Sequence, residues 1–253
     1  MTQLLQKLPE VSADALELLS TEEMIEVDRL MTDELKIELM QMMENAGRNL
    51  ARLCINQFLH EPQSKRVLVM AGTGGNGGGA LVAARRLHQW GATVSVLTTK
   101  PDEAYAGVPA HQLGILRRLG MEIDSTEIPE LQSAPDIILD GLIGYSLKGE
   151  PRGRAADLMA WANEASSPVL ALDTPSGLDS TTGEAHASTI VADATMTLAL
   201  PKAGLLTTSA QPFVGELYLS DIGVPDWVYQ KIGRDAELGR MFVHSDIVKI
   251  RQP

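Results

Sequence analysis

Three short segments carry the residue types that could do chemistry, and each follows a run of apolar residues. The first is GTGGNGGGALVAAR, residues 72–85. Its glycines let the backbone approach a ligand closely, and the free N–H groups at the start of a helix can hold a phosphate. The segment therefore predicts a phosphate-binding loop. The alternative is a strand-to-helix turn that needs glycine for backbone reasons alone.

This glycine loop formally contains the pattern GxGxxG in Gly72, Gly74 and Gly77, which alone is a weak signal. In dinucleotide-binding proteins an acid at the end of the second strand binds the ribose hydroxyls. Here the corresponding strand ends in Thr98 and Thr99. An ordinary NAD-dependent dehydrogenase is therefore disfavoured.

The second segment, LDGLIGYSLKGEPRG at 139–153, places Asp140 at the end of an apolar run and Lys148 in a glycine-rich loop. A carboxylate at a strand end can bind a cation, and a lysine on a loop can reach a phosphate or donate a proton. The alternative is an aspartate that caps the loop and a solvated lysine.

The third segment, LDTPSGLDS at 172–180, again ends an apolar run in an acid, Asp173, and continues through a proline and glycine turn that contains Ser176. Such a turn could aim both side chains across the sheet edge toward the first loop. A plain turn with an aspartate cap is the alternative. This alternative is disfavoured, because two acids lie at two strand ends beside a glycine loop.

The elements that must position these segments are short apolar runs alternating with amphipathic stretches. Parallel strands need crossover connections, and each crossover helix covers a face of the sheet. The pattern predicts an α/β fold, a three-layer αβα Rossmann-like sandwich with a mostly parallel sheet. The predicted strands are 67–72, 93–99, 136–140, 168–173, 194–200 and 216–220, and the predicted helices between them are 79–90, 108–119 and 154–166.

Two further helices are expected before the first strand. Thr21, followed by two acids, predicts a hydroxyl cap at a helix start, and apolar residues at helical spacing predict a longer helix from about 33 to 59. We expect one domain over residues 1–233, with 234–253 as a C-terminal tail or linker remnant.

Composition narrows the class of protein. The 253 residues carry a net charge of −12, which argues against nucleic acid as a partner, because phosphate backbones are bound by clustered Lys and Arg. No segment is apolar enough to span a membrane, so no membrane association is expected. The single cysteine, Cys54, excludes an intramolecular disulfide and a thiolate metal cluster, and predicts a cytoplasmic protein.

Taken together, the segments resemble the YjeF N-terminal family of NAD(P)H-hydrate epimerases. The resemblance covers roughly residues 19–225 and follows the order LLSTEEMIEVDRLMTDEL, LMQMMENAGRNLA, the glycine loop, GYSLKG, DTPSGLD, ATMTLALPKAGL and FVGELYLSDIGVP. Several ordered matches are far more specific than any one of them. The resemblance implies a hydrated NADH or NADPH as substrate and K+ (potassium) as a bound ion.

Carried over by position, the resemblance assigns K+ to Asn76, Asp140 and Ser176, all oxygen donors suited to a hard cation. One departure is visible in the first loop. The family usually has NNGGDG where this chain has Gly75 to Ala80, so one Asn and the Asp are replaced by glycine. The substrate contacts implied by the resemblance are Gly75, Asn76, Gly77, Gly78, Gly79, Gly144, Tyr145, Ser146, Leu147, Lys148, Gly149, Glu150 and Asp173.

The expected reaction is acid–base chemistry at the hydrated carbon of the nicotinamide ring, with Asp173 and Lys148 as the catalytic pair. A non-catalytic nucleotide-binding or scaffold module of the same fold is the main alternative, because the glycine loop is altered. An unrelated nucleotide-dependent oxidoreductase is a third. The resemblance also implies a homodimer and an ADP- or ATP-dependent dehydratase domain or partner. Packing of the methionine-rich N-terminal helix on its own core is an equally good alternative to dimerisation.

Overall fold

The computed structural model describes residues 7–130, 134–236 and 238–252. Within them the chain is built on one sheet of nine strands. Each strand predicted from an apolar run is present, with bounds that differ by a residue or two. The strands are β1 (Glu10–Ser12), β2 (Arg66–Ala71), β3 (Thr93–Thr98), β4 (Glu122–Asp124), β5 (Ile137–Gly141), β6 (Val169–Leu172), β7 (Ala194–Leu198), β8 (Glu216–Ser220) and β9 (Ile247–Arg251).

The strand order is β1-β9-β8-β7-β6-β5-β2-β3-β4. All neighbours from β8 to β4 are parallel, while β9 pairs antiparallel with β8 and parallel with β1. The prediction of a mostly parallel sheet is therefore confirmed. From β2 the chain builds outward to β4, then returns to β5 and builds the other way to β8. This reversal creates a switch point between β2 and β5, which is where open α/β sheets form their ligand crevice.

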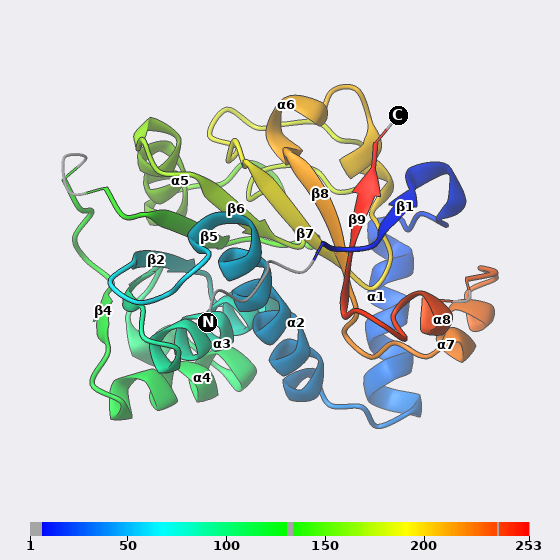
Figure 1. Cartoon of the computed structure of the whole chain (residues 1–253), viewed down its shortest axis with the longest axis horizontal. Coiled ribbons are helices and arrows are strands. Elements are labelled where there is room, and N and C mark those ends of the chain that lie inside the picture. The colour runs from blue at the N-terminus through cyan, green and yellow to red at the C-terminus, as the bar shows by residue number, and fades with distance from the viewer. Residues whose placement is uncertain (1–6, 131–133, 237, 253) are drawn as a thin grey trace.

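Helices cover both faces of the sheet, which gives the three layers expected from the sequence (Figure 1). Successive residues of β2 show why: Val67 and Val69 face the larger core with α2, α3 and α4, while Leu68 and Met70 face α5. The helices are α1 (Thr21–Arg29), α2 (Leu39–Cys54), α3 (Gly75–Gln89), α4 (Gly107–Arg118), α5 (Arg154–Glu164), α6 (Gln211–Val214), α7 (Asp226–Lys231) and α8 (Leu238–Met241). Short 3-10 turns η1 (Ala13–Ala15), η4 (Asp102–Ala104) and η6 (Ala203–Leu206) and π-helical turns η2 (Leu30–Glu34) and η3 (Ile55–Leu59) join them.

The structure corrects two predictions at the N-terminus. Ser20, not Thr21, caps α1: its hydroxyl accepts from the Glu23 N–H, and the Glu23 carboxylate accepts from the Ser20 N–H, a capping box. The long helix expected over 33–59 is interrupted before Leu39. Lys36 adopts a left-handed φ of 58°, and Glu38 is an extended N-cap that forms a capping box with Gln41.

The C-terminal segment contributes to the sheet. β9 lies between β8 and β1, with Leu219 opposite Val248 and Glu10 opposite Lys249. Residues 247–251, which the sequence analysis assigned to a tail or linker remnant, thus pair with strands of the main sheet. The division of the chain at residue 233 stays a prediction.

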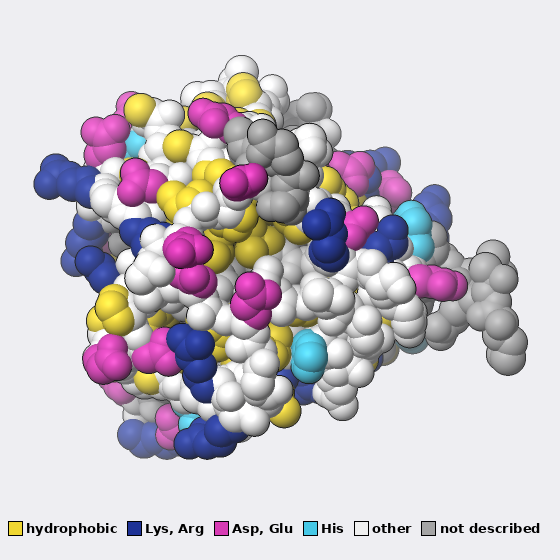
Figure 2. Space-filling model, turned by 90° about the vertical axis from the view of Figure 1, so that its left-hand side faces the viewer, with side chains coloured by type: hydrophobic (Ala, Val, Ile, Leu, Met, Phe, Trp, Pro, Cys, Tyr) yellow, Lys and Arg dark blue, Asp and Glu magenta, His cyan; other side chains and the backbone are white. Residues whose placement is uncertain are grey.

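The surface beside β4 carries charged side chains of both signs (Figure 2). On the face beside β4, acidic and basic side chains are interspersed rather than gathered by sign (Figure 2). No helix in the described part of the chain is long and apolar enough to cross a membrane. Cys54 is buried among apolar residues of the core, and burial raises the pKa of its thiol to about 12.

Candidate active site

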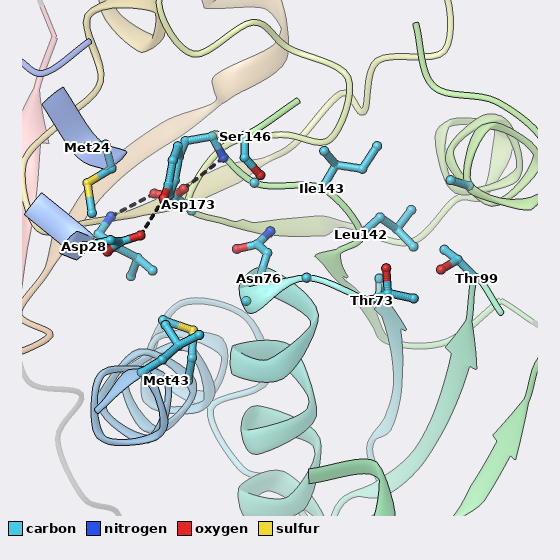
Figure 3. A pocket seen from close by; sticks show the side chains of 18 of the residues that line it. Met24, Asp28, Met43, Thr73, Asn76, Thr99, Leu142, Ile143, Ser146 and Asp173 are labelled. Carbon is cyan, nitrogen blue, oxygen red and sulfur yellow. Dashed lines mark hydrogen bonds between the residues drawn. The ribbon is translucent and has the colours of Figure 1, made fainter. Parts of the chain in front are cut away.

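A pocket of about 600 Å³ opens beyond the carboxyl ends of the central strands (Figure 3). It lies at the switch point, so loops after β2, β5 and β6 all reach it. The start of α3, the side of α2 and the start of α5 close it. Among its lining residues are Met24, Asp28, Met43, Gly72, Thr73, Gly74, Gly75, Asn76, Thr99, Lys100, Leu142, Ile143, Gly144, Tyr145, Ser146, Arg152, Arg154, Asp173 and Lys202.

The glycine loop forms the start of α3. Gly74 is the N-cap, the helix begins at Gly75, and both residues line the pocket with their backbones. Asn76 lies one residue further, and its amide donates a hydrogen bond to the Leu172 carbonyl at 3.0 Å. The first turn of a 15-residue helix therefore faces the pocket with free N–H groups, which favour an anionic group.

The next three residues, Gly77, Gly78 and Gly79, let α3 pack closely against neighbouring elements and do not line the pocket. A Cβ on Gly77 would lie 1.9 Å from the Gly72 carbonyl oxygen, and a Cβ on Gly78 would lie 3.1 Å from Val108 Cγ1. A Cβ on Gly79 would lie 2.9 Å from Leu172 Cδ2. For these positions, the simpler explanation that glycine permits close backbone packing is sufficient.

The two glycines that replace family side chains are expected to differ in their tolerance of substitution. The nearest atom to a Cβ on Gly75 is Met43 Sδ at 4.0 Å, so Gly75→Asn should change the free energy of unfolding by less than about 0.5 kcal/mol. Gly79→Asp buries a carboxylate against Leu172 and should cost more than about 2 kcal/mol. Urea unfolding of both variants measures the difference. Equal stabilities would show that α3 can shift to accept the acid.

Asp140 and Ser176 form a buried network at the ends of β5 and β6. Ser176 donates its N–H to Asp140 Oδ2 at 2.8 Å and its hydroxyl to Oδ1 at 2.6 Å, and the Leu142 N–H donates to Oδ1 at 3.1 Å. Complete burial raises the pKa of Asp140, and the hydrogen bonds from Ser176 and Leu142 oppose that shift. No cationic side chain of the described residues forms an ion pair with this carboxylate.

Asn76 lies against the backbone that follows β5, the same loop that contacts Asp140 and Ser176. A Cβ on Gly144 would lie 3.2 Å from Asn76 Cγ and 3.3 Å from Asp173 Oδ2, so the loop passes between these two side chains with little room for a larger residue. The N–H of Ile143, the residue before Gly144, donates to the Ser176 hydroxyl at 2.9 Å. The structure thus brings the three predicted cation ligands to one loop.

Asp173 forms a buried ion pair with Lys202, whose ammonium group donates to Oδ1. The other carboxylate oxygen accepts from the Tyr145 N–H at 3.2 Å. Asp173 has a φ of 67°, a left-handed conformation that is costly outside glycine and is often found at functional sites. Both charged side chains are almost fully buried, at 4% and 0% exposure, yet both line the pocket.

Lys202 is held both by a distant segment of the chain and by the nearby end of β7. Leu19 pairs with it in an isolated parallel β-bridge, and the ammonium group also donates to the Leu198 carbonyl at 2.9 Å. The same group lies 5.9 Å from the centroid of the Tyr145 ring. Lys202 thus has a fixed position rather than the mobility of a surface lysine.

Asp28 on α1 completes this end of the pocket, where the Tyr145 hydroxyl donates to its carboxylate at 2.5 Å. Burial raises the pKa of Asp28, while the hydrogen bond from Tyr145 and the charge of Lys202 oppose the shift. Burial and the nearby Asp28 charge also raise the pKa of Tyr145. Two carboxylates, a phenol and an ammonium group therefore share one end of the pocket.

The structure does not bring all of the predicted loop residues to the pocket. Gly144, Tyr145 and Ser146 line it, whereas the following residues, Leu147, Lys148, Gly149 and Glu150, do not. Lys148 is exposed, and the lysine beside Asp173 is Lys202. Sequence reasoning did not single out Asp28 and Lys202, which line the pocket, although both lie inside segments that carry the family resemblance.

The site combines a helix that begins at a glycine loop with a buried ion pair, and both lie at the switch point of a parallel sheet. These features are typical of Rossmann-like proteins that bind a ligand at the carboxyl ends of their strands. The chain belongs to the family described as YjeF-related protein N-terminus, which matches residues 39–204.

Similar proteins agree with this assignment. A protein of Dehalogenimonas lykanthroporepellens named NAD(P)H-hydrate epimerase is 44% identical over 211 residues, which cover 83% of each chain. One of Pyrobaculum aerophilum named bifunctional NAD(P)H-hydrate repair enzyme is 39% identical, and the match covers 73% of this chain and 37% of that protein. The crystal structure of the yeast protein ynu0 matches with a TM-score of 0.77 at 22% identity, covering 92% of this chain and 100% of the yeast chain, which supports the fold.

Proposed function

We propose that this chain is an NAD(P)H-hydrate epimerase, an isomerase that interconverts the R and S epimers of hydrated NADH or NADPH. The observation that carries the proposal is the buried Asp173–Lys202 pair, which lines the same pocket as the glycine-rich start of α3. The names of relatives that match most of the chain support the same activity. The pocket volume of about 600 Å³ lies within the range of small-molecule sites.

The reaction is acid–base chemistry at one carbon. Hydration leaves a hydroxyl on the carbon next to the ring nitrogen of the reduced nicotinamide. When a proton is delivered to this hydroxyl, the C–O bond breaks, water leaves, and the nitrogen lone pair forms a C=N bond. Water then adds to the opposite face of the C=N bond, which restores the C–O bond with inverted configuration. The added water finally gives up a proton. A positioned acid and base are all that the protein must supply.

Asp173 is our candidate for the group that exchanges this proton, since it lines the pocket. Lys202 holds the Asp173 carboxylate in place by an ion pair and keeps positive charge at this end of the pocket. The Tyr145 N–H fixes the second carboxylate oxygen. The backbone of Gly74 and Gly75 would bind the pyrophosphate, which places the nicotinamide toward Asp173.

The direct test is to incubate the purified protein with a single hydrate epimer and follow the other by chromatography. Rapid equilibration of the two epimers is expected. If the protein binds nicotinamide nucleotides but leaves the epimer ratio at the rate of buffer alone, it is the non-catalytic nucleotide-binding module instead.

We also propose that K+ binds beside Asp140, Ser176 and Asn76. The residues fit the ion: carboxylate, hydroxyl and amide oxygens suit a hard cation, and the fully buried Asp140 has no ion-pair partner among the described residues. The described residues contain no group of three or more His, Cys, Asp or Glu side chains placed to hold a metal ion, so a transition metal is not expected in this site. When bound, K+ would supply positive charge near the loop after β5.

Potassium is expected to raise the melting temperature of the wild-type protein relative to tetramethylammonium, by a stabilisation of roughly 1–3 kcal/mol at saturating ion. Asp140→Asn should abolish this difference, because it removes the only full negative charge of the proposed site. Glu164→Gln, an exposed acid at the end of α5, is the matched control and should keep the potassium response. An identical melting temperature in both salts for the wild type would overturn the proposal.

The remaining expectations belong to the same proposal. Location in the cytoplasm agrees with the single buried cysteine. A homodimer and a dehydratase partner or domain are implied by the family, and sedimentation of the purified chain tests the former.

A further inference from the structure

The pocket has two ends of different chemistry, and only one has a role in the proposed function. Asp28 and Asp173 lie together at one end, while Thr73 and Thr99 lie at the other, with Asn76 at the start of α3 between them (Figure 3). A ligand that places a reacting ring beside Asp173 and a pyrophosphate on α3 therefore has its far end near Thr99.

The far end is lined by three cationic side chains, Lys100, Arg152 and Arg154. Lys100 follows β3, and the arginines lie at the start of α5. Arg154 is fixed by donating to the Thr98 carbonyl at 2.8 Å and to the Glu127 carbonyl at 2.8 Å. Its side chain is only 15% exposed.

Lys100 and Arg152 differ from Arg154 because both are exposed and have no ion-pair partner in the described part of the chain. Two acids near this end are engaged with other groups. Asp102 forms a bidentate pair with Arg117, and Asp124 accepts from the N–H groups of Thr126 and Glu127 and lies 4.0 Å from Arg154. Two cations thus remain available to an anion at the rim of a protein whose net charge is −12.

Their position corresponds to the ribose end of a dinucleotide. In Rossmann-like sites an acid at the end of the second strand binds the two ribose hydroxyls, and it would repel a phosphate on the 2′ oxygen. Here β3 is that strand, and it is followed by Thr99 and Lys100. A hydroxyl and an ammonium group in place of the acid favour a phosphorylated ribose.

We propose that Lys100 and Arg152 bind the 2′-phosphate of the adenosine ribose, so that the pocket prefers phosphorylated nicotinamide dinucleotides over their unphosphorylated counterparts. The inference rests on the proposed function for the orientation of the ligand, and it assigns hydrated NADPH as the better substrate. Arg154 positions the start of α5 against β3 and is not the discriminating group.

The test compares Lys100→Met, Arg152→Met and the double variant with wild type, using NADP+ and NAD+ as probes in calorimetric titrations. Each single variant should weaken NADP+ binding about 3- to 10-fold and the double variant roughly 10- to 100-fold, since charge-assisted hydrogen bonds are lost. NAD+ affinity should stay within about twofold. Arg118→Met, an exposed arginine on α4 outside the pocket, is the matched control and should alter neither affinity.

Kinetics with the two hydrates separate this inference from the proposed function. The wild type should show a higher kcat/KM for hydrated NADPH, and the double variant should lose that preference. Equal affinity of wild type for NADP+ and NAD+, or an equal loss for both in the double variant, would overturn the subsite even if both hydrates are epimerised. Tighter NADP+ binding without any epimerisation would support the subsite and sink the proposed function instead.

Discussion

Asp173→Asn is expected to lower the turnover of hydrate epimers by roughly 10²–10⁴-fold, the usual contribution of a general acid–base group. Asparagine keeps the size of the side chain and can still accept a hydrogen bond from the Tyr145 N–H. It cannot exchange the proton in the same way. Affinity for NADP+ should change little, because the phosphates bind at α3. The measurement is kcat for epimerisation beside the dissociation constant of NADP+.

The variant also leaves Lys202 without its buried counter-charge, so a lower melting temperature should accompany the loss of turnover. Activity must therefore be measured at a temperature where circular dichroism shows the variant to be folded. Full turnover by folded Asp173→Asn would remove Asp173 from the proton-transfer step.

Lys202→Met is expected to destabilise the fold by about 3–5 kcal/mol, the largest stability effect anticipated for this chain. Lys202 is completely buried, and its removal leaves the Asp173 carboxylate buried and unpaired. The double variant Asp173→Asn with Lys202→Met should recover much of this free energy of unfolding but none of the activity. Urea unfolding of the wild type, the two single variants and the double variant gives the coupling energy.

A zero coupling energy would mean that the two side chains do not interact as a pair.

Lys148→Met decides between the two lysines as the partner of Asp173. Because Lys148 is exposed and lies outside the pocket, this substitution should leave kcat within a few-fold of wild type. A collapse of kcat in Lys148→Met with intact folding would restore Lys148 as the catalytic lysine.

The central strands could be predicted because a buried parallel strand needs an unbroken apolar run, as in VLVMAG or PVLALD. The ends of those runs then located Asp140 and Asp173, which the structure places at the carboxyl ends of the neighbouring parallel strands β5 and β6. The break before Leu39 was missed because apolar residues on both sides of it pack on the same core, so the helical spacing continues across the left-handed Lys36.

Lys202 could not be identified from local pattern alone. A lysine after a proline is ordinarily solvated, and its burial here results from the Asp173 carboxylate and the Leu19 backbone, neither of which is near it in sequence. Lys148 was preferred because it lies in a glycine-rich loop, but the direction of a loop side chain is set by tertiary packing. Asp28 likewise could not be told apart in the sequence from the other acids on α1. Only its hydrogen bond from the Tyr145 hydroxyl, seen in the structure, distinguishes it.

The bridge between Leu19 and Lys202 has a consequence for the order of folding. It joins the N-terminal segment to the loop after β7, and contacts of such large sequence separation close slowly because loop-closure entropy opposes them. The strands from β2 to β8 and their helices can form without the N-terminal segment, whereas the lysine reaches its final position only when that segment docks. During refolding, competence for catalysis should therefore trail the recovery of secondary structure, and a chain that looks folded by its helices can still lack an assembled site.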